Sequence, residues 1–485
     1  MADGDAHKFA QKAAIWTHVP KWKMRDASDD LVRQHPEWSC SSKVRHSSGL
    51  IIFSILLGSI GLLGPSVFFW VMNFGLIGLF TVLIAMRGAL IALGAIGRVR
   101  EHFADKASIS EKESWPIYSA LIPLYKEAAT VPKLVRGLKN LNYPRDRLEV
   151  IFLTEEDDHE TRAALDRAGV PAHWPILVLP DGQPRTKPRA LNLALSGLKG
   201  TFVTIYDAED SPHPDQLKAA INALEKAGED MACVQAPLEA YNARSSWIAG
   251  QWALEYDTHF GLILPALAKA KRPIALGGTS NHFRVSALRE AGGWDAWNVT
   301  EDADLGLRFS RLGYRIGTIA LPTLEEAPER LGVWVPQRSR WIKGYMQSAA
   351  VVMRHPFRAM RQMGATSFLA SQVLLGGAIL SAGLHGPMAI LVLLALLVPG
   401  VSLPTVCIYL LVAGYVLNFI AAILAPGRKD MRRLWLMVTA VFYWPLQSLG
   451  AIRALYELAK APHMWAKTPH GLTQTDLSER APAST

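Results

Sequence analysis

Two carboxylates are spaced so that they could share a metal ion. The strand expected over residues 202–207 ends in Asp207, and Glu209 follows two positions later. Side chains at this spacing after a strand point the same way, and Mg²⁺ and Mn²⁺ favour sites built from one or two carboxylates and substrate phosphates. Asp at the end of a strand is also a common helix cap. The residues alone therefore leave a metal site and a structural cap both open.

A second group combines glycines with acids. Gly278 and Thr279 lie in a Gly-Gly-Thr run, whose glycines would let a ligand approach the backbone or would simply form a turn. Thr300, Glu301 and Asp302 precede an amphipathic run and could begin a helix with acidic first-turn residues. A carboxylate at that place could equally act as a general base.

A third group, Gln337-Arg338-Ser339-Arg340-Trp341, opens an amphipathic stretch over 332–356. Arg and Trp near a membrane boundary commonly anchor a protein. In a site that handles sugars, Trp offers a flat apolar face, and Gln and Arg donate hydrogen bonds to hydroxyls or phosphates. Both interpretations fit these residues.

The elements that must position these groups follow an α/β pattern from roughly Ser110 to Pro328. Apolar residues share one helical face over 134–141 and again over 217–224. The expected strands are 118–124, 149–154, 175–179, 202–207 and 231–236. Alternating strands and helices predict a mostly parallel sheet with helices on both faces, and ligands bind beyond the carboxyl ends of such strands.

The rest of the chain has the composition of a membrane protein. Half of its 485 residues are hydrophobic and only 19% are charged. Residues 49–97 are long enough for a transmembrane hairpin of two helices, interrupted only by Arg87, which could serve a function but could also snorkel or pair near the interface. Basic residues on both flanks place its two ends, and the extension 1–48, in the cytoplasm.

Further apolar segments follow the amphipathic stretch, which we expect to reach residue 360 as interface helices. These segments lie at 367–384, 387–400, 403–425 and 434–457. Two plus four helices would return the tail 458–485 to the cytoplasm. In that arrangement the basic residues between 428 and 433 would lie outside, against the positive-inside rule.

Several function classes are disfavoured by composition. The net charge of +9 is spread along the chain, which suits cytoplasmic loops of a membrane protein better than nucleic-acid binding. Cys40, Cys233 and Cys407 lie far apart, which argues against a zinc site or a disulfide framework. The first 48 residues are polar, so we expect no cleavable signal peptide.

The order of these motifs resembles family 2 glycosyltransferases. It is similar in particular to the processive branch that contains bacterial cellulose synthase, hyaluronan synthase and bacterial β-glucan synthases. The resemblance covers roughly residues 49–470 and implies a cytosolic GT-A domain, a Rossmann-like α/β fold for nucleotide-diphospho-sugar transfer, inserted in a bundle of transmembrane helices. The motifs that carry it are Pro123–Glu127, the acids 155–158, Lys187–Asn192, Asp207–Glu209, Thr300–Asp302 and Gln337–Trp341.

The resemblance assigns a donor site. The residues that would bind the nucleotide or its phosphates are Pro123, Tyr125, Glu127, Glu155, Asp157, Lys187, Asp207 and Arg340. Glu155, Glu156, Asp157 and Asp158 occupy the place of the family's first aspartate pair; because the first two are Glu rather than Asp, which of the four acids contacts the nucleoside stays open. The metal, Mg²⁺ or Mn²⁺, would be held by Asp207 and Glu209, where the family's motif ends in Asp; Asp210 is an alternative second ligand.

The same resemblance makes Asp302 the general base, with Glu301 beside it. It places Gln337 and Trp341 at the acceptor, where Gly278 and Thr279 are further candidates. The tail around Trp465 resembles, more loosely, a cytosolic segment near the diphosphate in hyaluronan synthase-like enzymes. Lys467 and His470 would be its phosphate contacts, and an ordinary interfacial tail is the alternative.

The implied activity is that of an inverting, UDP-sugar-dependent hexosyltransferase in the plasma membrane. It would polymerise a β-linked exopolysaccharide of β-glucan type, with UDP-glucose as the donor by the family's precedent, and pass the product through its own helices. An alternative is transfer of one sugar to a lipid, as in ceramide glucosyltransferase-like enzymes. A transporter with a nucleotide-sensing domain would instead release no UDP.

Overall fold

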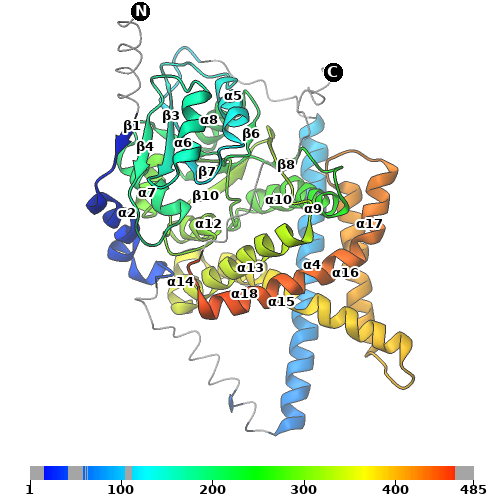
Figure 1. The fold of residues 1–485 in the computed structure, drawn as a ribbon. Helices are drawn as coiled ribbons and strands as arrows, with labels where there is room; N and C mark the ends of the chain where they lie inside the picture. Colours follow the sequence, from blue (N-terminus) through cyan, green and yellow to red (C-terminus); the bar gives the residue numbers. More distant parts are fainter. Residues whose placement is uncertain (1–15, 42–57, 60–61, 63, 104–111, 465–485) are drawn as a thin grey trace, which may run out of the picture.

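The computed structural model describes residues 16–41, 58–59, 62, 64–103 and 112–464. An α/β domain lies against a group of long helices, one of which, α4 (Pro65–Phe103), runs beside both parts (Figure 1). The first half of the expected hairpin falls mostly outside the described residues.

The central sheet has eight strands in the order β1-β4-β3-β2-β5-β9-β7-β10. Along the chain they are β1 (Trp16–His18), β2 (Tyr118–Leu124), β3 (Leu148–Glu155), β4 (Ile176–Leu179), β5 (Phe202–Ile205), β7 (Met231–Gln235), β9 (Asn281–Arg284) and β10 (Arg315–Thr318). The five strands expected from the sequence are thus confirmed. All neighbours pair in parallel except β9, which was not expected and lies antiparallel between β5 and β7.

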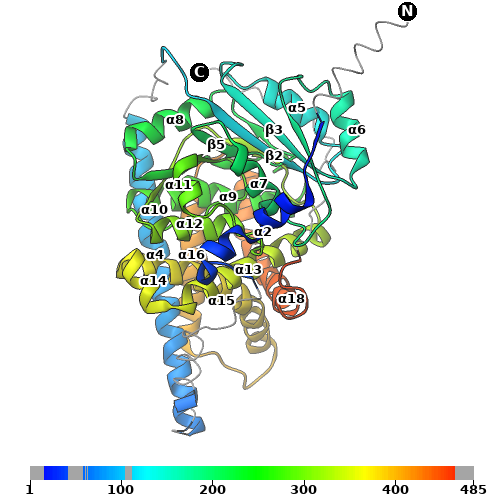
Figure 2. The same ribbon diagram turned by 90° about the vertical axis from the view of Figure 1, so that its left-hand side faces the viewer.

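Helices cover both faces of this sheet, as expected (Figure 2). On β2, Ile122 packs in one core with Leu134 and Leu217, whereas Leu121 packs in the other core with Leu191. These partners lie on α5 (Val131–Lys139), α8 (Gln216–Ala227) and α7 (Lys187–Gly197). The remaining helices of the domain are α6 (His159–Arg167), α9 (Trp247–Thr258), the π-helical η2 (His259–Ile263), α10 (Leu264–Lys269), α11 (Val285–Glu290) and α12 (Glu301–Arg311).

A small second sheet, in the order β6-β11-β8, lies next to the central one. Its strands are β6 (Ser211–Pro212), β8 (Leu238–Ala240) and β11 (Thr323–Glu325). Two helices then lead towards the long ones, α13 (Leu331–Arg354) and α14 (Pro356–Met363). They occupy the range where interface helices were expected.

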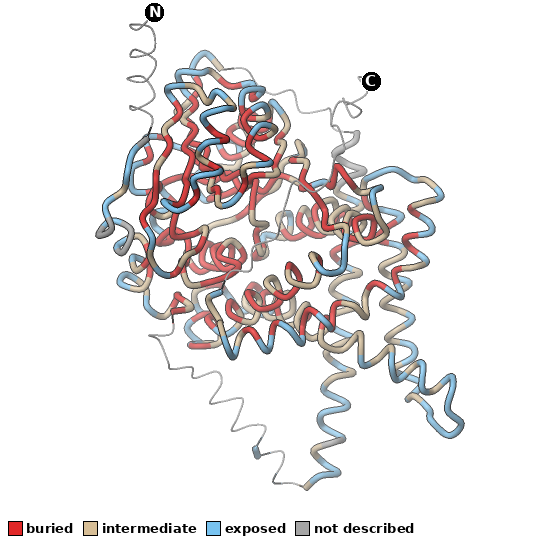
Figure 3. The backbone as a smooth tube through the Cα atoms, in the orientation of Figure 1, coloured by how far each residue is buried: buried red, intermediate tan, exposed pale blue. Residues whose placement is uncertain are grey.

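Four stretches of the described chain are long and apolar enough to cross a membrane. They comprise α4, α15 (Ala365–Leu397), α16 (Thr405–Leu424), and the run of α17 (Met431–Tyr443), η3 (Trp444–Leu446) and α18 (Gln447–Lys460). Figure 3 shows that much of α4 and α16 is exposed, whereas the α/β domain is buried inside. Long helices that present apolar residues outward fit a lipid environment.

The segments expected at 367–384 and 387–400 form the single helix α15, which accommodates Pro387 in its interior. Membrane helices tolerate proline because neighbouring groups can satisfy the freed carbonyl. The fourth stretch is not one straight helix, because α17 and α18 point in different directions on either side of η3 (Figures 1 and 2). With 13 residues, α17 is about 20 Å long, too short to span a membrane alone, and α18 lies beside α13.

The basic segment after α16 contacts the α/β domain. Arg433 forms an ion pair of 2.7 Å with Asp257, and Arg244 forms one of 2.8 Å with Asp430. Arg432 donates to the backbone carbonyl of Ser246 at 3.0 Å. These contacts place the segment beside the α/β domain, and the structure has the single helix α15 where two membrane segments were expected. If α15 crosses a membrane once, the segment lies on the same side as the α/β domain, and the conflict with the positive-inside rule does not arise.

The described part of the N-terminal extension packs on the α/β domain. It adds β1 to the edge of the sheet beside β4, and continues as α2 (Lys21–Gln34) and η1 (Pro36–Trp38). Arg354 at the end of α13 donates to the backbone carbonyls of Pro36, Glu37 and Ser39 at 3.0–3.3 Å. The extension thereby joins the sheet to α13.

Candidate active site

A cavity of about 1250 Å³ begins at the carboxyl ends of the central strands and continues between the long helices. Nearly all the residues singled out in the sequence line it. They are Pro123, Tyr125, Glu127, Glu155, Lys187, Asp207, Glu209, Gly278, Thr279, Glu301, Asp302, Gln337, Arg340 and Trp341. Motifs spread over more than 200 positions of the chain thus meet at one place.

The corner next to β2 and β3 holds a ring and a carboxylate. The buried Arg189 donates to both carboxylate oxygens of Glu155, at 3.0 and 3.2 Å. The guanidinium of Arg185 lies 4.7 Å from the centre of the Tyr125 ring. Burial raises the pKa of Glu155, although the charges of Arg189 and Arg185 oppose that rise. The flat ring can stack on a nucleotide base, and the carboxylate beside it can accept hydrogen bonds from that base.

The other acids of this motif have different places. Asp157 is half exposed, does not line the cavity and forms an ion pair with Arg185. Asp158 caps α6, since its carboxylate accepts a hydrogen bond from the Thr161 N–H at 3.2 Å. Among these four acids, Glu155 is therefore the one that reaches the cavity.

Lys187, the first residue of α7, connects two of the expected motifs. Its ammonium donates to the carboxylate of Asp207 and, at 2.6 Å, to the carbonyl oxygen of Gly278. Burial opposes its charge, but the carboxylates of Asp207, Glu301 and Asp302 together raise the pKa of Lys187. A permanently charged ammonium here is suited to bind phosphate.

The acids after β5 divide into a structural one and two that face the cavity. The buried Asp210 accepts hydrogen bonds from the Thr279 hydroxyl and, at 2.7 Å, from the Asp207 N–H, so it holds the turn. Burial raises the pKa of Asp210 well above its ordinary value. Asp207 and Glu209 line the cavity instead.

These two carboxylates fit a divalent cation. The described part of the chain contains no cluster of three or more His, Cys, Asp or Glu side chains that could hold a metal. Mg²⁺ and Mn²⁺ need no such cluster, because they bind through one or two carboxylates and complete their shell with substrate phosphates and water. Asp207 and Glu209 supply that donor set.

Glu301 and Asp302 open α12 at the wall of the cavity. Asp302 accepts a hydrogen bond from the Ala303 N–H at 2.8 Å. Burial raises the pKa of Asp302, while that hydrogen bond and the charges of Lys187 and Arg340 lower it. Burial and the neighbouring charge of Asp302 raise the pKa of Glu301 to about 8. At pH 7 Glu301 is therefore mainly protonated, so Asp302 has no second negative charge beside it.

Two glycines let the elements of the site approach closely. A Cβ on Gly278 would lie 3.3 Å from Oδ2 of Asp302. A Cβ on Gly344 would lie only 2.1 Å from the hydroxyl oxygen of Thr300, the residue before α12. Gly344 therefore permits the contact between α13, which carries Gln337 and Trp341, and the start of α12.

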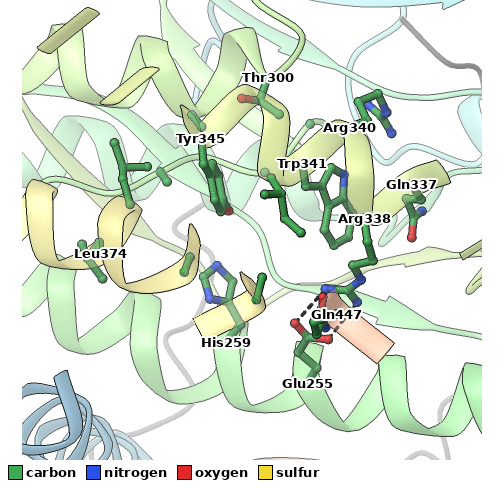
Figure 4. Close-up of a pocket in the computed structure, with 18 of the residues that line it drawn as sticks. Glu255, His259, Thr300, Gln337, Arg338, Arg340, Trp341, Tyr345, Leu374 and Gln447 are labelled. Carbon is green, nitrogen blue, oxygen red and sulfur yellow. Dashed lines mark hydrogen bonds and ion pairs between the residues drawn. The ribbon is translucent and has the colours of Figure 1, made fainter. Parts of the chain in front are cut away.

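Aromatic side chains form a row along the cavity. The rings of Tyr256 and Trp252 stack with centroids 3.6 Å apart, and the Trp341 ring lies 6.1 Å from Tyr256 at an angle of 25°. Figure 4 shows Trp341 and Tyr345 pointing from α13 into the cavity, with His259 opposite them. Stacked flat faces of this kind suit the apolar faces of sugar rings.

An ion pair fixes α13 against α9 below this row. Arg338 binds Glu255 with two contacts, of 2.8 and 2.7 Å, drawn as dashed lines in Figure 4. The neighbouring Gln337 is buried, and its carbonyl oxygen Oε1 has no hydrogen-bond partner among the described residues. An unsatisfied buried acceptor facing a cavity is available for a ligand's hydroxyl.

Some parts of the site were not expected. Tyr256, His259, Glu255 and Tyr345 line the cavity but belong to no motif singled out in the sequence. Their spacing held a signal, because Trp252 and Tyr256, like Trp341 and Tyr345, are four residues apart and share a helix face. Lys467 and His470 lie outside the described residues.

Comparison with known proteins agrees with this geometry. Residues 202–427, from β5 through α16, match the family described as Glycosyl transferase family group 2. This stretch, just under half of the chain, is similar to a family 2 glycosyltransferase domain. The chain is 27% identical over 278 residues to a beta-monoglucosyldiacylglycerol synthase of Trichormus variabilis, an alignment that covers 56% of each chain. It is 26% identical over 252 residues to a cellulose synthase catalytic subunit [UDP-forming] of Pseudomonas fluorescens, which covers 49% of this chain and 32% of that one.

The fold of the chain is also that of a known structure. The mannosyltransferase PcManGT from Pyrobaculum calidifontis, solved with GDP-Man and Mn²⁺, superposes with a TM-score of 0.51 at 20% identity, covering 79% of this chain and 99% of that one. The expected GT-A fold is confirmed. The chain spans about half the length of the first curated relatives it matches.

Proposed function

We propose that this chain is an inverting hexosyltransferase that moves a sugar from a UDP-sugar to a hydroxyl presented from the membrane. One observation carries the proposal: the cavity that holds Lys187, Asp207 and Asp302 continues without interruption between α4, α15 and α16. The donor would bind on the sheet side and the acceptor would enter from the helix side. An α-linked donor would give a β-linked product.

The chemistry follows from the charges at the junction of the two halves. Asp302 takes the proton of the acceptor hydroxyl as its oxygen attacks the anomeric carbon. Partial desolvation suits this role, because it raises the affinity of Asp302 for a proton. Lys187 and Arg340 stabilise the negative charge that develops on the departing diphosphate.

Asp207 and Glu209 would hold a Mg²⁺ or Mn²⁺ ion, which supplies further charge neutralisation for the leaving group when bound. On the other side of the donor, Tyr125 and Glu155 would contact the nucleoside. UDP-glucose is the first donor to test.

The geometry supports a lipid acceptor best. The part of the cavity between the helices is lined mainly by apolar side chains, including Leu76, Phe80, Leu384, Met388 and Leu410. Moving hydrocarbon chains from water into such a space is favourable, whereas the hydroxyls of a sugar polymer would lack hydrogen-bond partners there. This acceptor is the alternative expected from the sequence.

Polymerisation of a β-glucan-type exopolysaccharide is the second candidate. The aromatic row of Trp252, Tyr256 and Trp341 favours it, because successive sugars could stack there. The length and linkage of the product distinguish a single-sugar lipid from a polymer.

We place the enzyme in the plasma membrane with its catalytic domain in the cytoplasm, where UDP-sugars are made. The apolar surfaces of α4 and α16 and the basic segment on the catalytic side support this orientation.

Asp302→Asn tests the proposed mechanism. Release of UDP from a panel of UDP-sugars should fall by roughly 10²- to 10⁴-fold, the usual contribution of a general base, while UDP binding stays near that of the wild type. Asp166→Asn, which changes an exposed acid of α6 outside the cavity, is the matched control and should keep normal turnover. If Asp302→Asn retains half of the wild-type activity, the assignment of the base is wrong.

A further inference from the structure

Arg87 is a charged residue in an apolar part of the cavity. It lies on α4, within a stretch apolar enough to span a membrane. Of the cavity-lining residues that α4, α15 and α16 contribute to the described structure, Arg87 alone is charged. Charges at such positions are costly, and they usually pair or serve a function.

No partner within the described residues satisfies this guanidinium. Its Nε is buried without a hydrogen-bond partner, and Arg87 takes part in none of the described hydrogen bonds or ion pairs. The negative charge that acts on Arg87 is that of Glu255. Its carboxylate is already bound by Arg338 at 2.7 and 2.8 Å and by the Tyr443 hydroxyl at 3.0 Å. Two guanidiniums therefore share one carboxylate, and one positive charge is left over.

The two neighbouring histidines do not balance the positive charge of Arg87. Burial, together with the positive charges of Arg87 and Arg338, lowers the pKa of His259 to about 4 although the charge of Glu255 opposes this, so this side chain is neutral at pH 7. Nδ1 of His385 lies 2.5 Å from the carbonyl oxygen of Ser381. Both rings line the cavity together with Arg87 and add polar groups around it.

The cavity around Arg87 has one polar part and one apolar part. On one side the cavity leads to the catalytic pair Glu301 and Asp302. On the other it is lined by apolar side chains of three helices, among them Leu76, Ile77, Phe80, Met388, Leu391 and Leu411. A hydrocarbon chain fits the second part, and a phosphate fits the unpaired guanidinium, which can bind it with two parallel hydrogen bonds.

We propose that Arg87 binds the phosphate of a phospholipid that also carries a free hydroxyl, and that this phospholipid is the acceptor. This inference rests on the proposed function. The lipid chains lie between α4, α15 and α16, and the headgroup hydroxyl points towards Asp302. The hydroxyl oxygen bonds to the anomeric carbon, the bond from that carbon to UDP breaks with its electron pair leaving on the diphosphate, and the hydroxyl proton passes to Asp302.

Lipid binding can be measured separately from turnover. Native mass spectrometry of the full chain in detergent, titrated with phosphatidylglycerol, phosphatidylcholine or diacylglycerol, reports binding without any donor. We expect phosphatidylglycerol to bind about tenfold more weakly to Arg87→Gln than to the wild type, and Arg87→Lys to lie between them. Arg361→Gln removes an exposed arginine of α14 outside the cavity, and it should bind as the wild type does.

Turnover then tests whether the bound lipid is the acceptor. With UDP-glucose, phosphatidylglycerol has the hydroxyl and the phosphate, whereas diacylglycerol has the hydroxyl alone. We expect Arg87→Gln to lose about tenfold in kcat/KM for phosphatidylglycerol and much less for diacylglycerol, whereas Arg361→Gln should keep the wild-type rate of UDP release. Inorganic phosphate should compete only weakly, because it lacks the chains.

Three results would overturn the inference. These are equal binding of all three lipids by the wild type and Arg87→Gln, complete competition by inorganic phosphate, or a sugar polymer as the product with no glycosylated lipid. Failure of the proposed function would be visible separately, as the absence of UDP release from every UDP-sugar while lipid binding still depends on Arg87. Thermal unfolding of Arg87→Gln and Arg87→Lys shows whether the variants are folded.

Discussion

Lys187 connects residues that lie far apart in the sequence. Its ammonium reaches Asp207, after β5, and the carbonyl oxygen of Gly278, before β9. Gly278 in turn lies next to the carboxylate of Asp302. The positive charge is thus shared between the acid that would face the diphosphate and the acid that would take the proton, so the leaving group and the base are coupled through one side chain.

The pair Glu301 and Asp302 leads to a prediction about pH and stability. Because the pKa of Glu301 is raised to about 8 in the folded chain, the folded state keeps a proton that the unfolded state loses near the ordinary pKa of glutamate, about 4.3. The folded state therefore loses stability as the pH rises between these values. Glu301→Gln removes this loss, so its unfolding temperature should exceed that of the wild type by more at pH 9 than at pH 5.

Differential scanning fluorimetry of the two proteins in the same detergent, at pH steps between 5 and 9, measures this difference. Glu229→Gln is the control, since Glu229 is 94% exposed and should show no such trend. A gap between wild type and Glu301→Gln that stays constant with pH would contradict the buried, protonated state of Glu301.

The sequence predicted which residues meet in the cavity better than it predicted their hydrogen-bond partners and charges. The order of the motifs was enough to name Asp207, Lys187 and Asp302. It could not separate Glu209 from Asp210 as the acid that faces the cavity, because that depends on the Thr279 hydroxyl, a partner 69 positions away. Pairings of this kind become visible only when the strands are placed side by side.

At the scale of elements, the site depends on how closely α13 approaches α12. Gly344 faces Thr300, and a methyl group there would overlap the threonine hydroxyl at 2.1 Å. We expect Gly344→Ala to push α13 away from the start of α12, to destabilise the fold by about 1–3 kcal/mol, and to lower kcat by moving Trp341 relative to Asp302.

Gly332→Ala is the matched control on the same helix. A Cβ at Gly332 would meet nothing within 4 Å, and alanine gains up to about 1 kcal/mol over glycine in an exposed helix. Unfolding temperature and initial rates of UDP release compare the two variants. Equal behaviour of Gly344→Ala and Gly332→Ala would show that the α12–α13 contact does not position the site.

The elements themselves were predictable where the pattern was local. The five strands and the helices beneath them follow from short apolar runs and helical faces. The antiparallel β9 was missed because the Gly277–Gly278 pair before it has the composition of a turn, and its place between β5 and β7 is a long-range pairing. The division of 367–400 into two segments was wrong because a proline in a membrane helix need not end it.

For the whole molecule, the contacts of the segment after α16 determine the arrangement in the membrane. Its ion pair with Asp257 fixes it to the catalytic domain. With 33 residues α15 is about 50 Å long, and with 20 residues α16 is about 30 Å long, so each can cross the hydrocarbon core. We therefore expect the α15–α16 connection on the opposite side from the catalytic domain.

Cysteine labelling can test this topology. In a chain whose Cys40, Cys233 and Cys407 are replaced, single cysteines are introduced by Arg428→Cys after α16, Ser402→Cys between α15 and α16, and Asp146→Cys in the catalytic domain, all at exposed positions. A membrane-impermeant maleimide applied to intact cells should label Ser402→Cys alone. Arg428→Cys and Asp146→Cys should react only after permeabilisation, because both lie on the catalytic side. If Arg428→Cys were labelled in intact cells together with Ser402→Cys, α16 would not cross the membrane, and the acceptor lipid could not reach Asp302 between α4, α15 and α16 as proposed.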